Sequence, residues 1–449
     1  MMTNGTRQTL SEAIAASAHL LQGGASDYDP LLELIGDARF VLLGEATHGT
    51  HEFYQQRALI TKRLIREKDF TAVAVEADWP DAYRVNRYVR GEGSDNDATE
   101  ALGGFKRFPG WMWRNTDVVD FVDWLRAWND GQASAARTGF YGLDLYSLFT
   151  SMAEVLRYLD KVDPDAAVDA RQRYACFDHY GDDSEQYAYA AGIGHSESCQ
   201  NEVIAQLNSM QQRNGAAMQD EAIGASDALF YAQQNAQLVK NAEEYYRTMF
   251  RGRVAAWNLR DRHMSDTLDA LAVHLGQTRA QPPKIVVWEH NSHVGDARAT
   301  EVGRPGESNV GELSRERYGD CACLVGFSTY DGWVTAASDW DGPAERKQVL
   351  PALPGSYEDV FHQTGLGNFM LSLRPGSAAH ELLLERRLER AIGVLYLPRT
   401  ERQSHYFLSQ LPRQFDAILH FDTTSAVEPL EPASHRDTGD APETYPVGL

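Results

Sequence analysis

The 449-residue sequence is short of positive charge and contains no long apolar run. It has 42 Lys and Arg against 64 Asp and Glu, which gives a net charge of −22. A protein of that sign repels a phosphate backbone and an anionic lipid surface, so nucleic acid and membranes are disfavoured as partners. Because no stretch of 18 apolar residues occurs, we expect no transmembrane helix.

Cysteine is also scarce, and the four present are Cys176, Cys199, Cys321 and Cys323. They lack the paired CxxC spacing of a zinc site, so we interpret all four as reduced thiols in the core. The first 21 residues have apolar positions at helical spacing that are broken by Ser, Glu and His, unlike the continuous apolar segment of a signal peptide. We therefore expect a cytoplasmic protein.

Three motifs of covalent and phosphate chemistry are missing as well. The sequence has no Gly-x-Ser-x-Gly nucleophile elbow, no Walker phosphate loop and no Gly-x-Gly-x-x-Gly after a strand. Covalent serine catalysis is thereby disfavoured. The chemistry that remains is direct attack by an activated water, with an arginine or a protonated histidine stabilising an oxyanion.

Short apolar runs, by contrast, recur along the chain, in a composition typical of a soluble globular protein with 43% hydrophobic and 24% charged residues. We predict that these runs are buried strands of a parallel sheet. Helical patterns lie between them, so we expect an α/β fold with a mostly parallel central sheet and helices on both faces. The runs are 40–43, 71–75, 139–143, 285–288, 323–327, 369–373, 392–397 and 417–421.

The strand patterns disappear between about residues 150 and 275, where long amphipathic patterns replace them. We expect a helical insertion there, either a lid or a second lobe that forms a pocket against the sheet. Residues 1–29 are assigned to an N-terminal helical extension, and residues 30–428 to one domain that contains the insertion. Residues 429–449 are rich in Pro, Gly, Thr and acidic residues and are predicted to form a flexible tail.

Acidic residues and histidines follow four of the predicted strands. Because ligands bind beyond the carboxyl ends of parallel strands, these side chains are candidates for one shared site. A single acidic residue after a strand is most often a helix cap or a solvated charge, but recurrence at four strand ends favours a common site. The residues are Glu45 and His48 after the first strand, Glu76 and Asp78 after the second, Asp144 after the third, and Glu289, His290 and His293 after the fourth.

Arg57 is predicted to face the core from a helix at about residues 50–67, because it shares a helical stripe with three apolar residues. A buried guanidinium needs carboxylate partners. Helical side chains lean toward the N-terminus of their helix, where Glu45 and Glu76 would lie. A structural salt bridge and a role in the site are equally good interpretations of this arginine.

His48 lies in a glycine-flanked turn that can present an imidazole at the mouth of a pocket. A neutral imidazole is the best general base near pH 7, and an adjacent carboxylate would fix its tautomer and raise its basicity. An isolated histidine more often has a structural role. The carboxylates and the second pair of histidines around His48 favour the catalytic interpretation.

Tryptophans are candidates for the wall of the same pocket. Most aromatic residues in such a sequence belong to the core, but residues 108–115 stand before a predicted helix and are suited to line a pocket for a bulky apolar ligand. We therefore assign Trp79, Trp111 and Trp113 to substrate binding.

A metal site is left open by the sequence. His290 and His293, with Glu45, Glu76 and Asp144, would satisfy zinc or a related ion in number. They do not form the HExxH motif that places two histidines on one face of a helix. We expect that no cofactor is required and keep a divalent metal as the alternative.

Five segments in order along the chain resemble the erythromycin esterase family. They are LLGEATHGTHEF with Arg57, VEADWPDAYRVNRYVRG, FPGWMWRNTDVVDFVDWLR, NAEEYYRTMFRGRVAAWNLRDRHM and VVWEHNSHVGDAR. The resemblance covers about residues 30 to 430. It implies a carboxylic ester hydrolase that opens a macrolide lactone, with or without a metal, using water activated by His48. The other residues that carry over by motif are Glu45, Arg57, Glu76, His290 and His293.

The residues and the resemblance agree on one site, to which we assign roles. His48 is the general base, Glu45 and Glu76 orient it and the water, and Arg57 and His290 stabilise charge. Asp144 and His293 support the site by binding substrate, and the helical segment 257–263 is interpreted as structural. The expected partner is a small ester or macrolide. Two alternatives stay open: a metal-dependent hydrolase, and a ligand-binding protein that does not turn its ligand over.

Overall fold

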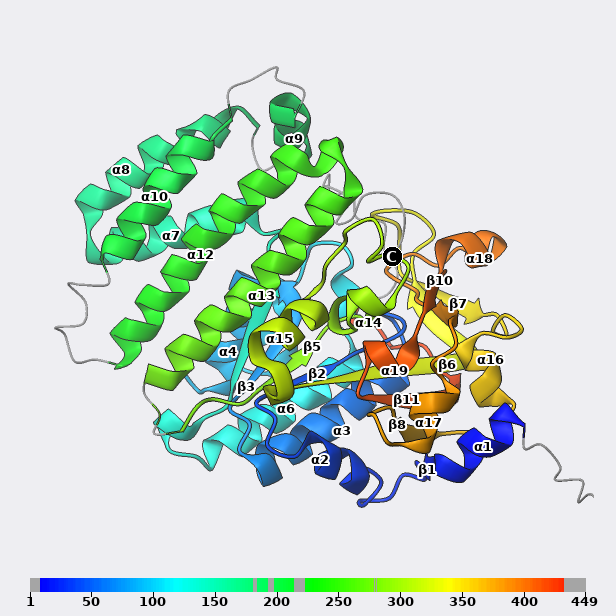
Figure 1. Cartoon of the computed structure of the whole chain (residues 1–449). Coiled ribbons are helices and arrows are strands. Elements are labelled where there is room, and N and C mark those ends of the chain that lie inside the picture. The colour runs from blue at the N-terminus through cyan, green and yellow to red at the C-terminus, as the bar shows by residue number, and fades with distance from the viewer. Residues whose placement is uncertain are drawn as a thin grey trace, which may run out of the picture.

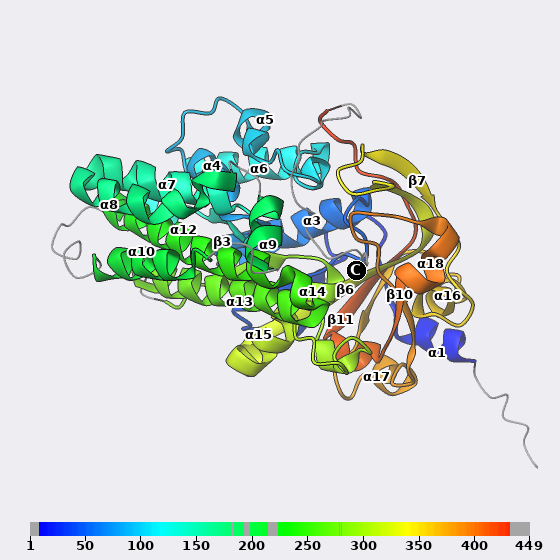
Figure 2. The same cartoon turned by 90° about the horizontal axis from the view of Figure 1, so that it is seen from above.

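The computed structural model describes residues 9–180, 184–192, 198–213, 223–277, 279 and 281–431. A twisted central sheet lies between two layers of helices, and a block of long helices extends from one end of it (Figures 1 and 2). In the view from above, α3 and α6 lie on one side of the sheet and α13 and α15 on the other. The α/β class predicted from the sequence is confirmed.

The sheet is mostly parallel, with strand order β1-β8-β11-β6-β2-β5-β3-β4 and β7 paired to β6. The pairs from β11 through β6, β2, β5 and β3 to β4 are parallel, whereas β8, β1 and β7 pair antiparallel. The strands are β1 His19–Leu20, β2 Phe40–Leu43, β3 Ala72–Asp78, β4 Gly139–Asp144, β5 Ile285–Trp288, β6 Ala322–Ala336, β7 Glu345–Val349, β8 Phe369–Ser372 and β11 Ala417–Thr424. A separate hairpin pairs β9 Arg387–Arg390 with β10 Tyr406–Ser409.

The central strands are apolar throughout because both of their faces are covered. In β2, Phe40 and Leu42 pack in the core beneath the long helices, whereas Val41 and Leu43 pack in the core on the opposite face. All four residues of β2 are buried, as are all four of β5. This double burial explains why unbroken apolar runs marked these strands.

Two of the predicted strands differ from the structure. The run at 392–397 is not a strand, because Ile392 and Leu395 form only isolated bridges, to Thr47 and Ala337. This segment crosses the loops at the carboxyl edge of the sheet and bonds to them residue by residue. The run at 369–373 forms β8, but β8 is antiparallel to β11, since an apolar run carries no information about strand direction.

Helices cover both faces of the sheet. The layer that contains α3 packs on the core of Val41 and Leu43, and α3 starts at His51, close to the predicted start. The helices outside the long block are α1 Leu10–Ser17, α2 Asp29–Ile35, α3 His51–Lys68, α4 Trp79–Val89, α5 Ala98–Ala101, α6 Thr116–Asp130, α14 Asn291–Val294, α15 Val310–Tyr318, α16 Tyr357–His362, α17 Ala378–Leu382, α18 Glu401–Ser404 and α19 Leu411–Gln414.

The segment without strand patterns folds into the block of long helices seen at the upper left of Figure 1. Its helices are α7 Leu148–Val162, α8 Pro164–Tyr174, α9 Ser184–Gly192, α10 Gln200–Gln212, α12 Ile223–Thr248 and α13 Arg253–Gln277. α12 packs on α7 and α10, whereas α13 packs on β4 of the sheet. α13 therefore joins the block to the strand ends.

The proposed division into extension, domain and tail stays a prediction. Of the tail, residues 432–449 lie outside the described residues, as do residues 1–8 at the other end. Residues 429–431 pack on the start of α6, where Leu430 donates its backbone N–H to the Arg114 carbonyl at 3.0 Å.

The interpretation of the cysteines as four reduced core thiols is wrong for three of them. Cys176 and Cys199 form a disulfide that links the turn after α8 to the start of α10. Cys321 is exposed, and Cys323 in β6 is the free thiol that is buried. The sequence separation of 23 residues between the bonded cysteines matched no motif that the sequence analysis considered.

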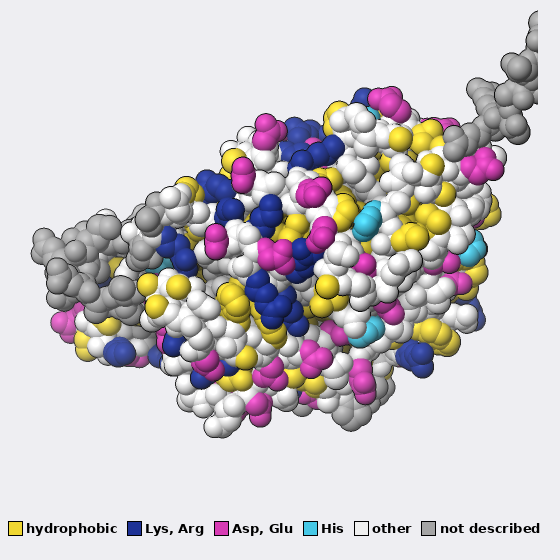
Figure 3. All heavy atoms as spheres, turned by 90° about the horizontal axis from the view of Figure 1, so that it is seen from below, with side chains coloured by type: hydrophobic (Ala, Val, Ile, Leu, Met, Phe, Trp, Pro, Cys, Tyr) yellow, Lys and Arg dark blue, Asp and Glu magenta, His cyan; other side chains and the backbone are white. Residues whose placement is uncertain are grey.

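Charges of both signs share the surface. On the face seen from below, Lys and Arg side chains gather near the middle and are interspersed with Asp and Glu (Figure 3). Within the part of the chain that the structure describes, no helix is long and apolar enough to span a membrane.

Candidate active site

The ends of β2, β3, β4 and β5 open on one cavity at the carboxyl edge of the sheet. Its volume is about 770 Å³ measured out to the opening. Seven of the candidate residues line it: His48, Glu76, Asp78, Trp113, Asp144, His290 and His293. The cavity lies where parallel strands are expected to place a ligand.

The loop after β2 holds His48 by close packing. A Cβ atom at Gly49 would collide with the Thr335 carbonyl, and one at Gly44 would collide with the Asn291 side chain, so both positions require glycine. The Tyr54 hydroxyl donates a hydrogen bond to the His48 carbonyl at 2.7 Å. These contacts fix the backbone of His48 at the mouth of the cavity.

Glu45 joins His48 to Arg57 in a buried chain of contacts. Its Oε1 lies 2.9 Å from His48 Nδ1, and its Oε2 lies 2.7 Å from a terminal nitrogen of Arg57. Arg57 is fully buried and also packs over the rings of Tyr54 and Trp288. Because the carboxylate accepts the Nδ1 proton, a neutral His48 keeps its lone pair on Nε2, the nitrogen left for a ligand.

Of the two carboxylates predicted to pair with Arg57, Glu45 and Glu76, one does so. Arg57 pairs with Glu45, whereas Glu76 is bound by Arg260 instead. Arg57 is not among the residues that line the cavity, so it acts on the site through Glu45. Glu76 likewise does not hydrogen-bond to His48, in contrast to the predicted orienting role.

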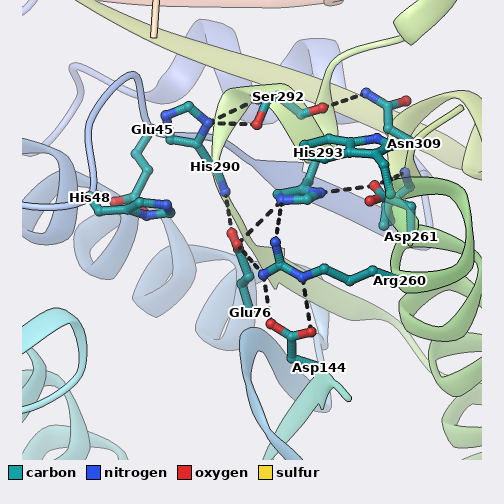
Figure 4. Close-up of polar contacts among 12 residues, drawn as sticks. Glu45, His48, Glu76, Asp144, Arg260, Asp261, His290, Ser292, His293 and Asn309 are labelled. Atoms are coloured by element: carbon teal, nitrogen blue, oxygen red, sulfur yellow. Dashed lines mark hydrogen bonds and ion pairs between the residues drawn. The ribbon is translucent and has the colours of Figure 1, made fainter. Parts of the chain in front are cut away.

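The His290 ring lies beside the His48 ring in the cavity wall, with the two ring centroids 4.8 Å apart (Figure 4). The backbone N–H of Ser292 donates to His290 Nδ1 at 3.2 Å, and the Ser292 hydroxyl lies 2.8 Å from the same nitrogen. Nδ1 is therefore an acceptor, which leaves the ring proton on Nε2. Burial and the neighbouring His48 lower the pKa of His290 well below its ordinary value, so the ring is neutral.

The Nε2 of His290 is buried and has no hydrogen-bond partner of good geometry among the described residues. A hydrogen-bond interaction with the Ala46 backbone partly offsets the lowering of the ring pKa. A buried N–H donor without a partner is rare in proteins and is common where a ligand supplies the acceptor.

Glu76 and Asp144 converge on Arg260, at the lower centre of Figure 4. One terminal nitrogen of Arg260 lies 2.8 Å from Glu76 Oε1 and 2.6 Å from Asp144 Oδ2, and its Nε lies 3.0 Å from Asp144 Oδ1. The other oxygen of Glu76 accepts the backbone N–H of His290 at 2.8 Å. Burial opposes the charge, but His293 first, and then Arg260 and His48, hold the pKa of Glu76 well below its usual range.

His293 is bound through both ring nitrogens. Its Nδ1 lies 2.9 Å from Asp261, and its Nε2 lies 3.3 Å from Glu76. The Trp257 ring stacks on it at 4.6 Å. Although burial opposes the charge, Asp261 and Glu76 raise the pKa of His293 to about 10, so the ring is an imidazolium at neutral pH.

Arg260 and Asp261 were missed by the sequence analysis, which treated residues 257–263 as structural. Both come from α13, and both are buried. An Arg-Asp-Arg run on a helix is usually part of a solvated face. The one feature of the sequence that could have indicated a role in the site is that both residues lie within one of the five segments that resemble the family. Glu289 also follows β5, but it is fully buried outside the cavity lining, and burial raises its pKa well above the usual value.

Of the three tryptophans assigned to substrate binding, Trp113 lines the cavity. Trp79 and Trp111 do not, so their assignment is corrected to the core. Trp79 is 2% exposed and packs against Tyr231 of α12, to whose carbonyl its indole N–H donates at 3.3 Å. Trp111 is buried in the core on the α3 side of the sheet.

A match to a family model shows which family the chain belongs to. Residues 65–424 match the model of the erythromycin esterase family. The chain belongs to the erythromycin esterase family. Arg260, His290 and Glu76 lie within the matched residues, whereas Glu45 and His48 precede them.

Two curated relatives cover most of the chain. The sequence is 22% identical over 422 residues to erythromycin esterase type II of Escherichia coli, covering 90% of this chain and 93% of the relative. It is 21% identical over 407 residues to the putative hydrolase YbfO of Bacillus subtilis strain 168, covering 87% and 84%. The protein is therefore a hydrolase of the erythromycin esterase family.

Solved structures share the erythromycin esterase fold. A protein from Bacillus cereus has a TM-score of 0.79 at 20% identity, covering 94% of this chain and 98% of its own. A succinoglycan biosynthesis protein has a TM-score of 0.76 at 19% identity, covering 95% and 100%. A mutant of the erythromycin esterase EreC in its open conformation has a TM-score of 0.64 at 17% identity, covering 90% and 95%.

In this member of the erythromycin esterase family, the side chains that could bind a metal ion already contact an arginine. Glu76, Asp144 and His293 are the acids and the imidazole that an ion would need, and Arg260 binds or contacts all three. Among the described residues, no group of three or more His, Cys, Asp or Glu side chains is arranged to hold a metal ion. As arranged, these residues do not fit a metal.

Proposed function

We propose that this protein hydrolyses a carboxylic ester by direct attack of a water molecule that His48 activates. The observation that carries the proposal is the pair of neighbouring rings, His48 and His290, which hold opposite tautomers at the rim of one cavity. His48 has its free lone pair on Nε2, and His290 has its free proton on Nε2. One ring is thus arranged to accept a proton and the other to donate a hydrogen bond.

His48 serves as the general base. Its Nε2 takes a proton from the water as the oxygen attacks the ester carbonyl, while Glu45 stabilises the imidazolium that forms. Arg57 holds Glu45 in place from behind. Once the tetrahedral intermediate collapses, the proton on His48 passes to the leaving alcohol, which returns the ring to its starting state.

His290 serves as the donor to the oxyanion. A carbonyl oxygen that gains negative charge needs a hydrogen-bond donor that is already in place and shielded from water. The neutral Nε2–H of His290 meets both conditions, because it is buried and has no well-formed hydrogen bond to another described residue. Glu76 fixes this donor by accepting the backbone N–H of His290.

The substrate we propose is a bulky or cyclic ester, macrolides included. Phe105, Trp113 and Trp340 line the cavity beside the reacting groups and offer an apolar wall to such an alcohol. The name of the Escherichia coli relative, erythromycin esterase type II, supports this class of substrate. We further propose a cytoplasmic location, with an action on small molecules and not on nucleic acid.

The test is to incubate the purified protein with a panel of macrolides and simple aryl esters and to follow the gain of one water by mass spectrometry. His48→Ala is expected to lower kcat by at least about 10²-fold, the usual contribution of a general base. His51→Ala is the matched control, since His51 follows closely in the sequence, at the start of α3, but pairs with Asp117 outside the cavity. Undiminished hydrolysis by His48→Ala would remove the proposed base.

We also propose that hydrolysis needs no divalent metal, because Arg260 occupies the centre of the donor set. Prolonged dialysis against a chelator is expected to leave kcat unchanged. A loss of activity that Zn²⁺ or Mn²⁺ restores would favour the metal-dependent alternative.

A further inference from the structure

The cavity contains one more carboxylate than its cations bind. Four carboxylates line it: Glu76, Asp78, Asp81 and Asp144. Glu76 and Asp144 are bound by Arg260, and Asp78 Oδ2 is bound by Arg107 at 2.9 and 3.0 Å. Asp81 makes no ion pair or hydrogen bond with any residue that the structure describes.

Asp81 stands at the border between the cavity and the outside. It lies in the first turn of α4 and is half-buried. It lines both the cavity and a neighbouring open groove of about 2070 Å³, which runs between α4 and the helices α7 and α12. Asp81 is therefore accessible from the cavity and from the groove.

Aromatic and acidic side chains line the same cavity. Phe105, Trp113 and Trp340 line it as Asp81 does, and the rings of Phe105 and Trp113 lie 6.2 Å apart. Gly104, next to Phe105 in the chain, lies against the Asp81 side chain. Asp78 is 4% exposed, and its second oxygen, Oδ1, has no hydrogen-bond partner among the described residues. Ring faces and an uncompensated carboxylate are the two features that recognise an organic ammonium group.

We propose that Asp81 and these rings form a subsite for a protonated amine carried by the substrate. The proposal deepens the proposed function: the ester would be that of an amino alcohol, with its carbonyl at His48 and His290 and its ammonium group at Asp81. The N–H of a protonated tertiary amine would donate to the Asp81 carboxylate, and its methyl groups would lie on the rings. A neutral ester of the same shape would lack both interactions.

The titration of Asp81 gives the proposal a second readout. Burial raises the pKa of Asp81 to about 8, and Asp78 and Glu154 add to the rise, whereas Arg107 and Arg84 oppose it. Asp81 is then mostly protonated at pH 7. An ammonium group favours the ionised form, so binding of an amine is expected to release a proton and to strengthen as pH rises toward 8.

The first experiment measures binding and needs no turnover. 2-(Dimethylamino)ethanol and its neutral isostere 3-methylbutan-1-ol are titrated into the protein by calorimetry, at pH 7 and in two buffers that differ in ionisation enthalpy. We expect the amine to bind at least about tenfold more tightly and with proton release. Equal affinities of the wild-type protein for the two alcohols would overturn the subsite.

The variant that tests the residue is Asp81→Asn, which keeps the shape and removes the group that ionises when the amine binds. It is expected to abolish both the preference for the amine and the proton release. Glu92→Gln is the matched control, because Glu92 lines the groove but not the cavity, and it is expected to retain both. If Asp81→Asn kept the preference, the assignment to Asp81 would be wrong. If that variant fails to fold, the two wild-type readouts still decide the proposal.

The second experiment separates this subsite from the ester hydrolysis. The substrates are 2-(dimethylamino)ethyl benzoate and 3-methylbutyl benzoate, compared by kcat/KM. We expect a preference of about tenfold for the amino ester that Asp81→Asn removes through KM and not through kcat. Hydrolysis of both esters at equal kcat/KM would contradict the proposed ammonium subsite but would support the proposed ester hydrolysis. Hydrolysis of neither ester, together with selective binding of the amine, would sink the esterase for these esters and leave the subsite intact.

Discussion

The two sides of the cavity differ in how completely their polar groups are paired. His48 and His290 each bind a neighbour through one ring nitrogen and keep the other uncommitted. His293, Arg260 and Glu76 are bound on every side by charged or N–H partners. The two rings that are placed to contact a substrate thus each keep one nitrogen free. The network of Glu76, Arg260 and His293 that supports them has all its charged groups paired, so a rearrangement would cost free energy.

The largest effect is expected from breaking the network of Glu76, Arg260 and His293. Arg260→Met would leave Glu76 and Asp144 buried without their cation, and loss of one partner from a buried ionic network costs about 3–5 kcal/mol in the free energy of unfolding. Urea denaturation measures the change. Arg262→Met, an exposed neighbour on α13, is the control and is expected to change stability by about 0.5 kcal/mol or less. Equal effects of the two variants would mean that the network does not hold the site.

On the unpaired side, substitution should impair catalysis and leave stability nearly unchanged. His290→Ala removes the oxyanion donor, and kcat is expected to fall by about 10²-fold, with little change in KM. His290→Gln, which restores a side-chain N–H, should recover part of the loss. Steady-state kinetics with an aryl ester provide the measurement. A fall in stability as large as that of Arg260→Met would contradict the contrast between the two sides.

The smallest effect concerns pH and tests the charge of His293. A raised pKa in the folded state means that His293 contributes stability fully below its ordinary pKa near 6.5 and loses it as pH rises through about 10. The wild-type protein should therefore lose on the order of 2 kcal/mol between pH 7 and pH 10 that His293→Gln does not lose. Urea denaturation at a series of pH values compares the two slopes. Parallel slopes would show that His293 is not held as an imidazolium.

The sequence predicted the part of the fold that burial alone determines. Runs such as 40–43 and 285–288 coincide with β2 and β5 because both faces of those strands are covered. The run at 392–397 is equally apolar but is buried under loops and not between layers, a difference that composition does not record. The antiparallel direction of β8 depends on the path of the whole chain, which no local pattern contains.

Site residues that follow strands could be predicted from the sequence, whereas site residues on helices could not. Glu45, His48, Glu76, Asp144 and His290 could be found because each follows an apolar run, and the parallel sheet brings such ends together. Arg260 sits among charged neighbours on α13, where one helical face meets solvent and another meets the strand ends. Its burial arises from the docking of α13, which lies more than a hundred residues from Asp144 in the sequence.

The docking of α13 also sets a limit on how this scaffold can diversify. Arg260 and Asp261 of that helix bind acidic or imidazole side chains that follow three different strands. α13 is therefore a fixed part of the site and does not act as a lid. α8, α9 and α10 contact the site through no such bond among the described residues. Grafting experiments that exchange those outer helices for others, while keeping α13 in register, offer a route to new substrate ranges without rebuilding the reaction centre.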